Sequence, residues 1–378
     1  MDNAAATPID SQVIKEMMEA MSLYANPSSF NDAGRSARKQ LDESRGEVAR
    51  FIGARPGEIV FTSSGSEANN LAVFSLANGC SKPGEIITTP VEHPSVSESL
   101  LGIAKRGWKI IYTKVGAGGI VDLKDFEKKL NSRVVFVSII YANHEIGTIQ
   151  PIAKISKIIR NFRTTSFPFF HVDACQASGY LDMNVNNLGV DMMTFNGAKI
   201  YGPRGIGVLY LRTGISIRPF ILGGDQERGL RAGTENLPAI AGLAKAVSLI
   251  NKNNGKKIAK LRDYFLEKVK EIIPKVMING PIGSSRLANN INISIPNLSS
   301  ENLLLELDKY GIYASAGSAC TARSVEPSHV LKAIGVEPQY INGALRFSLG
   351  RQTTKKEVDY VLQVLPKVVG DLRSRYKK

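Results

Sequence analysis

The chain has 378 residues, 43% of them apolar, which is enough for two globular domains with ordinary cores. No apolar run approaches the roughly 20 residues of a membrane-spanning helix, and the N-terminus shows no basic segment followed by an apolar one, so we expect a cytoplasmic protein with no signal peptide and no membrane partner. The formal net charge of +14 favours anionic ligands, but the basic residues are mostly scattered, which argues against a dedicated nucleic-acid function.

Short apolar segments alternate with amphipathic helical patterns through the first two thirds of the chain. Helices are expected first at 11–23 and 33–52. Strands then follow at 58–62, 85–89, 108–115, 134–140, 167–172, 190–195 and 208–211, with helices between them at 68–77, 95–104, 123–130 and 152–162. This alternation predicts an α/β fold whose mostly parallel sheet is covered by helices on both faces.

Polar residues stand where several of these strands end. In an open α/β sheet the carboxyl ends of the strands form the edge at which ligands bind. We therefore expect residues 64–67, His93, Asn143, Asp173 and Lys199 to build one site along that edge.

Two features of this edge point to a particular chemistry. The turn at 63–67 leads from a strand into a helix, where free N–H groups, the helix dipole and the Ser66 hydroxyl suit an anion. Asp173 and Lys199 suit pyridoxal 5'-phosphate (PLP), because a lysine can form an imine with its aldehyde and a carboxylate can keep its ring nitrogen protonated. No spacing of residues indicates a metal site.

The pattern changes after residue 239. Two long helical runs, 239–252 and 256–273, are expected to be joined by a break at Asn253–Gly255, and mixed strands and helices follow. We predict a large domain at 11–248 and a smaller α+β domain formed by 1–10 and 249–378. The glycines of 202–207 precede a strand instead of a helix, which excludes a dinucleotide fingerprint.

The three cysteines, Cys80, Cys175 and Cys320, form no close-spaced pair, which argues against a disulfide framework or a zinc knuckle and fits a reducing compartment. Cys320 lies in a segment of small residues, 316–323. A thiol there could act as a nucleophile or could pack as a small apolar side chain, and this segment alone leaves both readings open.

Short motifs from one end of the chain to the other resemble those of the cysteine desulfurases of the NifS/IscS type. These belong to the class-V aminotransferases and are PLP enzymes of fold type I. The matching segments are 2–8, 26–29, 61–63, 91–93, 143–147, 171–176, 199–203, 226–228, 317–320, 326–331 and 345–351.

The resemblance implies a set of cofactor contacts. Lys199 would form the imine and later move protons, Asp173 would pair with the ring nitrogen, Gln176 would bond the ring hydroxyl, and His93 would stack on the ring and relay protons. The phosphate would be held by Gly65, Ser66 and Asn196, helped by Thr234 of a second subunit in a homodimer.

It also implies how the substrate reacts. Asn143 and Arg346 would grip the carboxylate of L-cysteine, and Cys320 would attack its sulfur and become a persulfide, leaving L-alanine. The sulfur would then pass to an iron–sulfur scaffold or a sulfur-carrier protein, with an indirect link to tRNA thiolation. Arginine suits this role because it binds carboxylates with two parallel hydrogen bonds.

Some positions depart from the family pattern. Ala198 stands where a His usually contacts the phosphate, Asn196 where a Ser is common, Asn31 where a His is common, and Cys175 where a Thr is frequent. Two rival interpretations stay open: a selenocysteine lyase or aminotransferase-like relative, and a sulfur-relay scaffold without activity, which Ala198 motivates.

Overall fold

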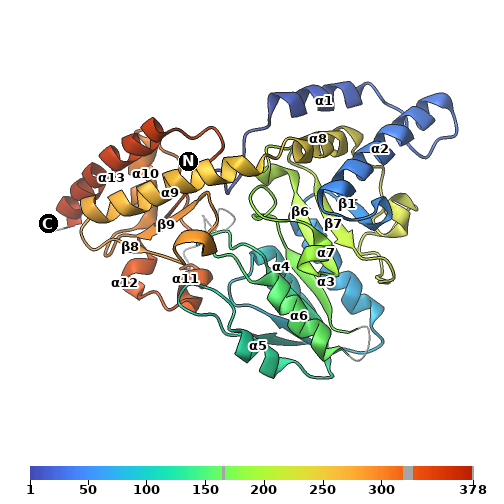
Figure 1. Cartoon of the computed structure of the whole chain (residues 1–378), viewed down its shortest axis with the longest axis horizontal. Coiled ribbons are helices and arrows are strands. Elements are labelled where there is room, and N and C mark those ends of the chain that lie inside the picture. The colour runs from blue at the N-terminus through green and yellow to red at the C-terminus, as the bar shows by residue number, and fades with distance from the viewer. Residues whose placement is uncertain (164–166, 318–326, 377–378) are drawn as a thin grey trace.

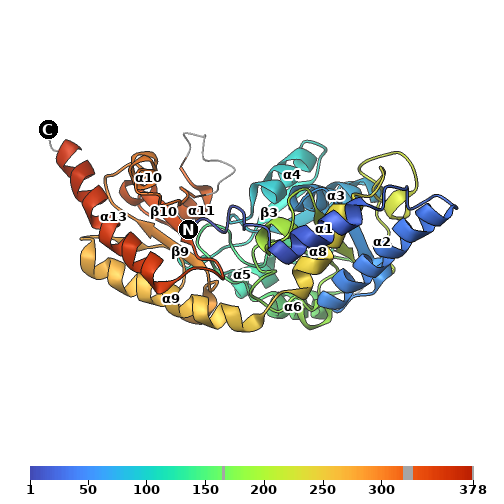
Figure 2. The same ribbon diagram turned by 90° about the horizontal axis from the view of Figure 1, so that it is seen from above.

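The computed structural model describes residues 1–163, 167–317 and 327–376. In Figures 1 and 2 the chain forms two parts, a larger one on the right built on a seven-stranded sheet and a smaller one on the left built on a three-stranded sheet. The large sheet has the order β1-β7-β6-β5-β4-β2-β3 and the small sheet the order β10-β9-β8.

The strands of the large sheet are β1 (Ile59–Thr62), β2 (Glu85–Thr88), β3 (Lys109–Tyr112), β4 (Val134–Ile140), β5 (Phe169–Asp173), β6 (Met192–Asn196) and β7 (Gly207–Leu211). Helices α1 (Ser11–Met21), α2 (Asp32–Phe51), α3 (Gly65–Gly79), α4 (Pro94–Ala104), α5 (Leu123–Lys129), α6 (Ile152–Phe162), α7 (Val185–Leu188) and α8 (Leu237–Ser248) accompany them.

The small part contains β8 (Met277–Ile278), β9 (Asn290–Ser294) and β10 (Ala344–Ser348). Its helices are α9 (Lys252–Ile272), α10 (Ser300–Asp308), α11 (His329–Ala333), α12 (Pro338–Ile341) and α13 (Lys355–Tyr376). Residues 1–4 join it as well, because Asp2 pairs with Ser348 at the edge of β10.

The mostly parallel sheet predicted from the alternation of strands and helices is confirmed. Strands β3, β2, β4, β5 and β6 run parallel, and β7 is antiparallel to both β6 and β1. The short connection between β6 and β7 explains the exception, since parallel neighbours need a crossover of a dozen or more residues. The carboxyl ends of β4, β5 and β6 therefore meet at one edge.

Both faces of the large sheet are buried. Successive side chains of a strand point to opposite faces, so Val208 and Tyr210 of β7 join one apolar cluster while Leu209 and Leu211 join the other. The first cluster also contains residues of α2, α6 and α8, and the second contains residues of α3 and α4. Burial on two faces explains why these strands are nearly continuous apolar runs.

The predicted break at Asn253–Gly255 is wrong. These residues lie in the first turn of α9, and the preceding helix α8 already ends at Ser248. The Asn251 side chain caps α9 by accepting a hydrogen bond from the Asn253 N–H at 2.9 Å. Asn and Gly are tolerated in a first turn because its N–H groups have no partner within the helix.

A separate apolar cluster joins the large part to the small part. Val91, Ile140 and Ile146 of the large part pack with residues of α11 and α12 in one buried cluster. Within the part of the chain that the structure describes, no helix is both long and apolar enough to cross a membrane.

A buried ion pair fixes the loop that precedes α8. Arg45 of α2 donates to both carboxylate oxygens of Glu227 at 2.7 Å, and the Phe61 N–H of β1 donates to the same carboxylate at 2.9 Å. The Arg45 and Glu227 side chains are only 9% and 2% exposed. Glu227 and Arg228 adopt positive φ angles of 49° and 60°, a strained conformation that these contacts hold in place.

Replacing Glu227 by Gln tests this anchor. The change leaves the Arg45 charge buried without its counter-ion, so we expect the free energy of unfolding to fall by about 3–5 kcal/mol in urea titrations. Glu47→Gln, which removes the partner of Arg50 in an exposed pair on the same helix, is the matched control and should cost less than about 1 kcal/mol. Equal losses in the two variants would contradict a special role for the buried pair.

Candidate active site

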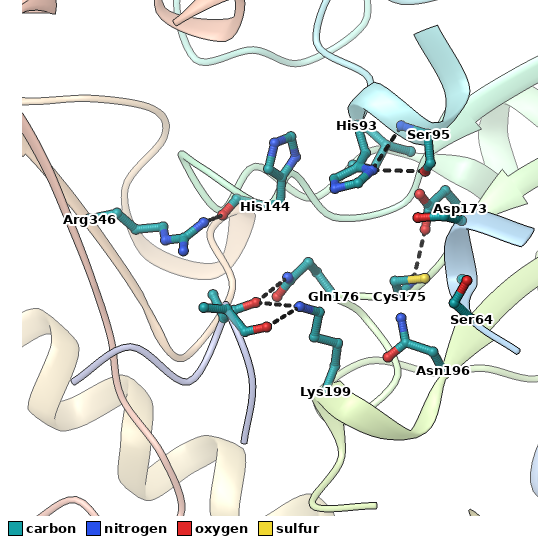
Figure 3. Close-up of a pocket in the computed structure, with 15 residues that line it drawn as sticks. Ser64, His93, Ser95, His144, Asp173, Cys175, Gln176, Asn196, Lys199 and Arg346 are labelled. Atoms are coloured by element: carbon teal, nitrogen blue, oxygen red, sulfur yellow. Dashed lines mark hydrogen bonds between the residues drawn. The ribbon is translucent and has the colours of Figure 1, made fainter. Parts of the chain in front are cut away.

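A cavity lies at the sheet edge where β4, β5 and β6 end (Figure 3). The structure brings most of the predicted site residues together there, although they come from distant parts of the chain. The predicted residues that line it are Gly65, Ser66, His93, Asp173, Gln176, Asn196, Lys199 and Arg346, and they are joined by Ala4, Ala5, Ser64, Ser95, Ile140, His144 and Cys175.

One corner of the cavity is suited to an anion. Helix α3 begins at Gly65, three residues earlier than expected, and Ser64 caps it by accepting from the Glu67 N–H at 3.1 Å. A Cβ added at Gly65 would lie 2.6 Å from Cys175 Sγ and 2.8 Å from Asn196 Nδ2. Only glycine therefore leaves this corner open, beneath the positive end of the helix dipole.

Asp173 is held by a chain of hydrogen bonds. The buried Asn69 amide donates to Asp173 Oδ2 at 2.9 Å and to Ser95 Oγ at 2.8 Å. Ser95 Oγ lies 2.8 Å from His93 Nδ1, and the Cys175 N–H donates to the other oxygen of Asp173 at 3.0 Å. The network links the carboxylate to the imidazole across the cavity wall.

His93 is neutral at physiological pH. Burial, and then the neighbouring His144, lower its pKa to about 4. The Ser95 N–H donates to Nδ1 at 3.1 Å, so the ring proton resides on Nε2. The Cys175 thiol is also buried. This burial, and then the nearby Asp173 charge, hold the pKa of the thiol well above its usual value, so the thiol is protonated.

The N-terminal segment forms a wall of the cavity. Lys199 Nζ donates to the backbone carbonyls of Ala4 and Ala5 at 2.8 and 2.6 Å. Gln176 Nε2 donates to the Ala4 carbonyl at 3.0 Å. The segment thus orients both side chains predicted to contact the cofactor.

Arg346 reaches the cavity from the small part of the molecule. Its side chain is buried, with Nη1 donating to the His144 carbonyl at 2.9 Å and Nη2 to Asp2 at 3.1 Å. Its Nε has no hydrogen-bond partner among the described residues. Arg346 also lines the cavity, so its guanidinium places a positive charge at the cavity wall.

Two predicted site residues that the structure describes, Asn143 and Thr234, do not line this cavity. The Asn143 amide donates to the Val91 carbonyl at 2.8 Å and accepts from the Glu145 and Ile146 N–H groups at 2.9 Å each, so it shapes the turn instead of lining the cavity. Thr234 is exposed in the loop before α8. Cys320 lies outside the described residues.

The sequence analysis missed four residues that shape the site: Asp2, Asn69, Ser95 and His144. Asn69 had a usable signal, because it lies one turn beyond Gly65 in the same helix and so faces the same side. Asp2 and His144 lie within segments that match the family, but no local pattern pairs Asp2 with Arg346, which is 344 residues away.

Comparison with known proteins agrees with this geometry. The aminotransferase class-V family model matches residues 1–361. Cysteine desulfurase IscS of Dictyoglomus turgidum is 43% identical over 100% of this chain and 96% of its own length. The chain belongs to the cysteine desulfurases of the class-V aminotransferase family.

Solved structures of this family share the fold closely. A NifS-like protein superposes with a TM-score of 0.91 at 35% identity, covering 98% of this chain and 99% of its own. SspA, solved in complex with cysteine, gives a TM-score of 0.82 at 31% identity, covering 93% of this chain and 99% of its own.

Members of this family use PLP, and the residues of the cavity fit that group. Asp173 offers a buried carboxylate, Lys199 an amine, and the Gly65 corner an opening beneath a helix N-terminus. Asn196 Oδ1 is buried with no partner among the described residues, so this corner holds unused polar capacity. Ala198 is not among the residues that line the cavity, and its carbonyl accepts from the Thr7 N–H and hydroxyl at 2.9 and 3.1 Å.

The fit at Gly65 gives a direct test. In Gly65→Ala the added Cβ meets Cys175 and Asn196, so we expect PLP affinity to fall at least about tenfold, the effect of losing one or two anion contacts. Gly46→Ala on α2, where a Cβ meets nothing within 4 Å, should bind PLP normally. Binding is measured by titrating the visible absorbance of the cofactor. Unchanged affinity in Gly65→Ala would show that the corner at Gly65 does not hold the phosphate.

Glu92, the neighbour of the cavity residue His93, is a further titratable group. Glu92 is fully buried, and this desolvation raises its pKa to about 8 despite hydrogen bonds from Thr89 and the Ile140 N–H. Because the folded state holds this proton more tightly than the unfolded state, its contribution to stability is present below pH 4.5 and is lost as the pH rises towards 8.

Glu92→Gln should therefore flatten the pH dependence of stability. We expect the free energy of unfolding of the wild type to fall more steeply between pH 5 and 8 than that of Glu92→Gln, as measured by urea titration at each pH. Glu98→Gln, a neighbouring exposed change on α4, should keep the wild-type slope. Parallel slopes for Glu92→Gln and the wild type would show that Glu92 does not hold this proton.

Proposed function

We propose that this protein is a PLP-dependent cysteine desulfurase that converts L-cysteine to L-alanine and leaves a persulfide on Cys320. The observation that carries the proposal is the meeting of three groups in one cavity: the Lys199 amine, the Asp173 carboxylate and the buried Arg346 guanidinium. Two of them suit PLP, and the third suits the carboxylate of an amino acid.

The cofactor residues act by position and charge. Asp173, held by Asn69 and the Cys175 N–H, would pair with the ring nitrogen. Gln176 would bond the ring hydroxyl, neutral His93 would stack on the ring, and Gly65, Ser66 and Asn196 would hold the phosphate. When bound, PLP supplies an electron sink for the pair released at the substrate's Cα.

The remaining residues handle the substrate. Arg346 binds its carboxylate through donors that Asp2 and the His144 carbonyl leave available. The Lys199 amine would take the Cα proton of the substrate and return one at Cβ. Asn143 positions this wall by fixing the 143–146 turn from behind.

Sulfur transfer completes the reaction. The Cys320 thiolate attacks the sulfur of the substrate, so that an S–S bond forms as the C–S bond breaks. The sulfur is oxidised and the carbon reduced, giving alanine after protonation, with no external redox partner. Gly317 and Ser328, on either side of residues 318–326, both lie against Glu145 beside the cavity, which supports a role for this segment at the site.

The homodimer and the sulfur acceptor are part of the proposal. Helix α1 presents Ile14, Met18 and Met21 to solvent, with Tyr24 and Phe30 exposed after it, and a second copy would cover such a surface. Thr234 would then reach the partner's phosphate site. We propose that the sulfur passes in the cytoplasm to an iron–sulfur scaffold or a sulfur carrier, including one that serves tRNA thiolation.

Mass spectrometry of the protein after addition of cysteine tests the reaction. We expect one extra sulfur on Cys320, together with stoichiometric alanine, in the wild type. Lys199→Ala should form neither, because the proton carrier and cofactor anchor are gone. Cys320→Ala should form no persulfide.

Two outcomes would contradict the proposal. Alanine formation from selenocysteine only, unaffected by Cys320→Ala, would identify a selenocysteine lyase. No cofactor absorbance in the wild type, even after PLP is added, would identify a scaffold without activity.

A further inference from the structure

Arg351 of the small part contacts two separate segments of the large part. It follows strand β10, which carries Arg346, and its guanidinium carbon lies 3.9 Å from the centre of the Tyr201 ring. The same guanidinium pairs with the Asp10 carboxylate, and the Arg351 N–H donates to the Tyr201 hydroxyl at 2.6 Å. The Arg351 and Asp10 side chains are only 21% and 16% exposed, and partial burial strengthens both a charge pair and a cation–π contact.

Tyr201 connects this contact to Lys199, which lies two residues earlier. Tyr201 has a positive φ of 62°, a conformation that costs free energy in a residue with a side chain. Its N–H donates to the Thr7 hydroxyl at 2.7 Å, and its carbonyl accepts from the Asp10 N–H at 3.0 Å. Asp10 is also the N-cap of α1. The turn that presents Lys199 and the start of α1 therefore meet at Arg351.

The packing around this contact is incomplete. A second cavity is lined by Tyr201, Arg351 and Lys199 together with residues from the end of α8 to the first turns of α9. Helix α8 belongs to the large part and α9 to the small part, so the two parts do not fill the space on this side of Lys199. Arg351 bridges them beside this cavity, where apolar packing contributes little.

The position of Arg351 bears on the substrate site. Arg346 and Lys199 reach the active-site cavity from different parts of the molecule, as Figure 3 shows. Strand β10 pairs with β9 as far as Ser348, so Arg351 follows closely on the sheet that carries Arg346. A shift of Arg351 relative to Tyr201 therefore moves Arg346 relative to Lys199.

We propose that Arg351 is a positioning residue for carboxylate recognition, because its contacts with Tyr201 and Asp10 set where Arg346 lies relative to Lys199. Arg351 does not line the active-site cavity, so it acts through Arg346 without touching the ligand. The inference rests on the proposed function, since it takes Arg346 to bind the carboxylate of an amino acid. The preference of the site for an amino acid over a simple amine then depends on a residue outside the cavity.

Two ligands that differ only in the carboxylate test this role. Ethylamine is L-alanine without its carboxylate. Binding of each to the full-length holoenzyme is measured by the change in cofactor absorbance, and KM and kcat for cysteine by alanine formation. The variants are Arg351→Gln, which lacks the charge, and Arg351→Lys, which keeps a charge opposite Asp10. Arg375→Gln, which breaks an exposed ion pair with Glu306 within the small part, is the matched control.

In Arg351→Gln we expect L-alanine to bind at least about tenfold more weakly, the effect of weakening one charged hydrogen bond at Arg346. The affinities for ethylamine and PLP should not change, and KM for cysteine should rise more than kcat falls. Arg351→Lys should recover part of the alanine affinity, and Arg375→Gln should behave as the wild type. Equal weakening of alanine and ethylamine would show general damage to the site, and an unchanged preference for alanine would show that Arg351 does not position Arg346. Either result would overturn the inference.

Failure of the proposed function gives a different result. A wild type that binds alanine no better than ethylamine would refute the carboxylate role of Arg346 and this inference with it, whereas a wild-type preference that persists in Arg351→Gln overturns this inference alone. If the wild type forms no alanine from cysteine, the proposed function fails, while the ratio of the two affinities still decides the role of Arg351.

A second variant covers the case in which Arg351→Gln does not fold. Tyr201→Leu removes the ring beneath the guanidinium and leaves the pair with Asp10. We expect it to weaken alanine binding relative to ethylamine binding in the same direction. An unchanged ratio of the two affinities in Tyr201→Leu would overturn the inference.

Discussion

The burial of the Arg346 guanidinium is the constraint on which the arrangement of the site depends. A charged group removed from water must have acceptors around it. It finds them in Asp2 of the N-terminal segment and in the His144 carbonyl of the large part, although it belongs to a strand of the small part. Three separate pieces of the chain are thereby tied at the cavity, and the correct position of each depends on the others.

The charges of the cavity follow from the same reasoning. Lys199 and Arg346 bring two cationic groups, Asp173 one carboxylate, and His93 is kept neutral by burial. Electrostatic attraction is stronger at such a poorly solvated site than in water. A ligand pair with a phosphate and a carboxylate complements this excess of positive groups, and the dipole of α3 adds to it.

Much of the fold and part of the site could be predicted from local sequence. Parallel strands buried on both faces appear as apolar runs, so the residues that end them, Asp173 and Lys199, stand out. Asn143 also stands at a strand end, but its amide is used by neighbouring backbone groups, which a linear pattern does not reveal. The prediction of a helix break at Asn253–Gly255 was wrong because residues that disrupt a helix interior are acceptable in a first turn.

The other features that could not be predicted from the sequence depend on contacts between residues far apart in the chain. The pairs Asp2–Arg346 and Arg45–Glu227 join residues far apart in the chain, and no periodicity marks them. The Asn69 network likewise depends on α3 and α4 packing side by side, which places Asn69 next to Ser95.

The two sets of site residues have different structural supports. The residues proposed to hold the cofactor stand on strand ends and helix starts of the large part, which is built around its own two apolar clusters. Arg346 comes from the small part, whose position is fixed by the cluster around Val91, Ile140 and Val330 and by the N-terminal segment. If Arg346 binds the substrate carboxylate as proposed, the packing between the two parts would set its distance from the cofactor, and a shift there would alter substrate binding while leaving the proposed cofactor site intact.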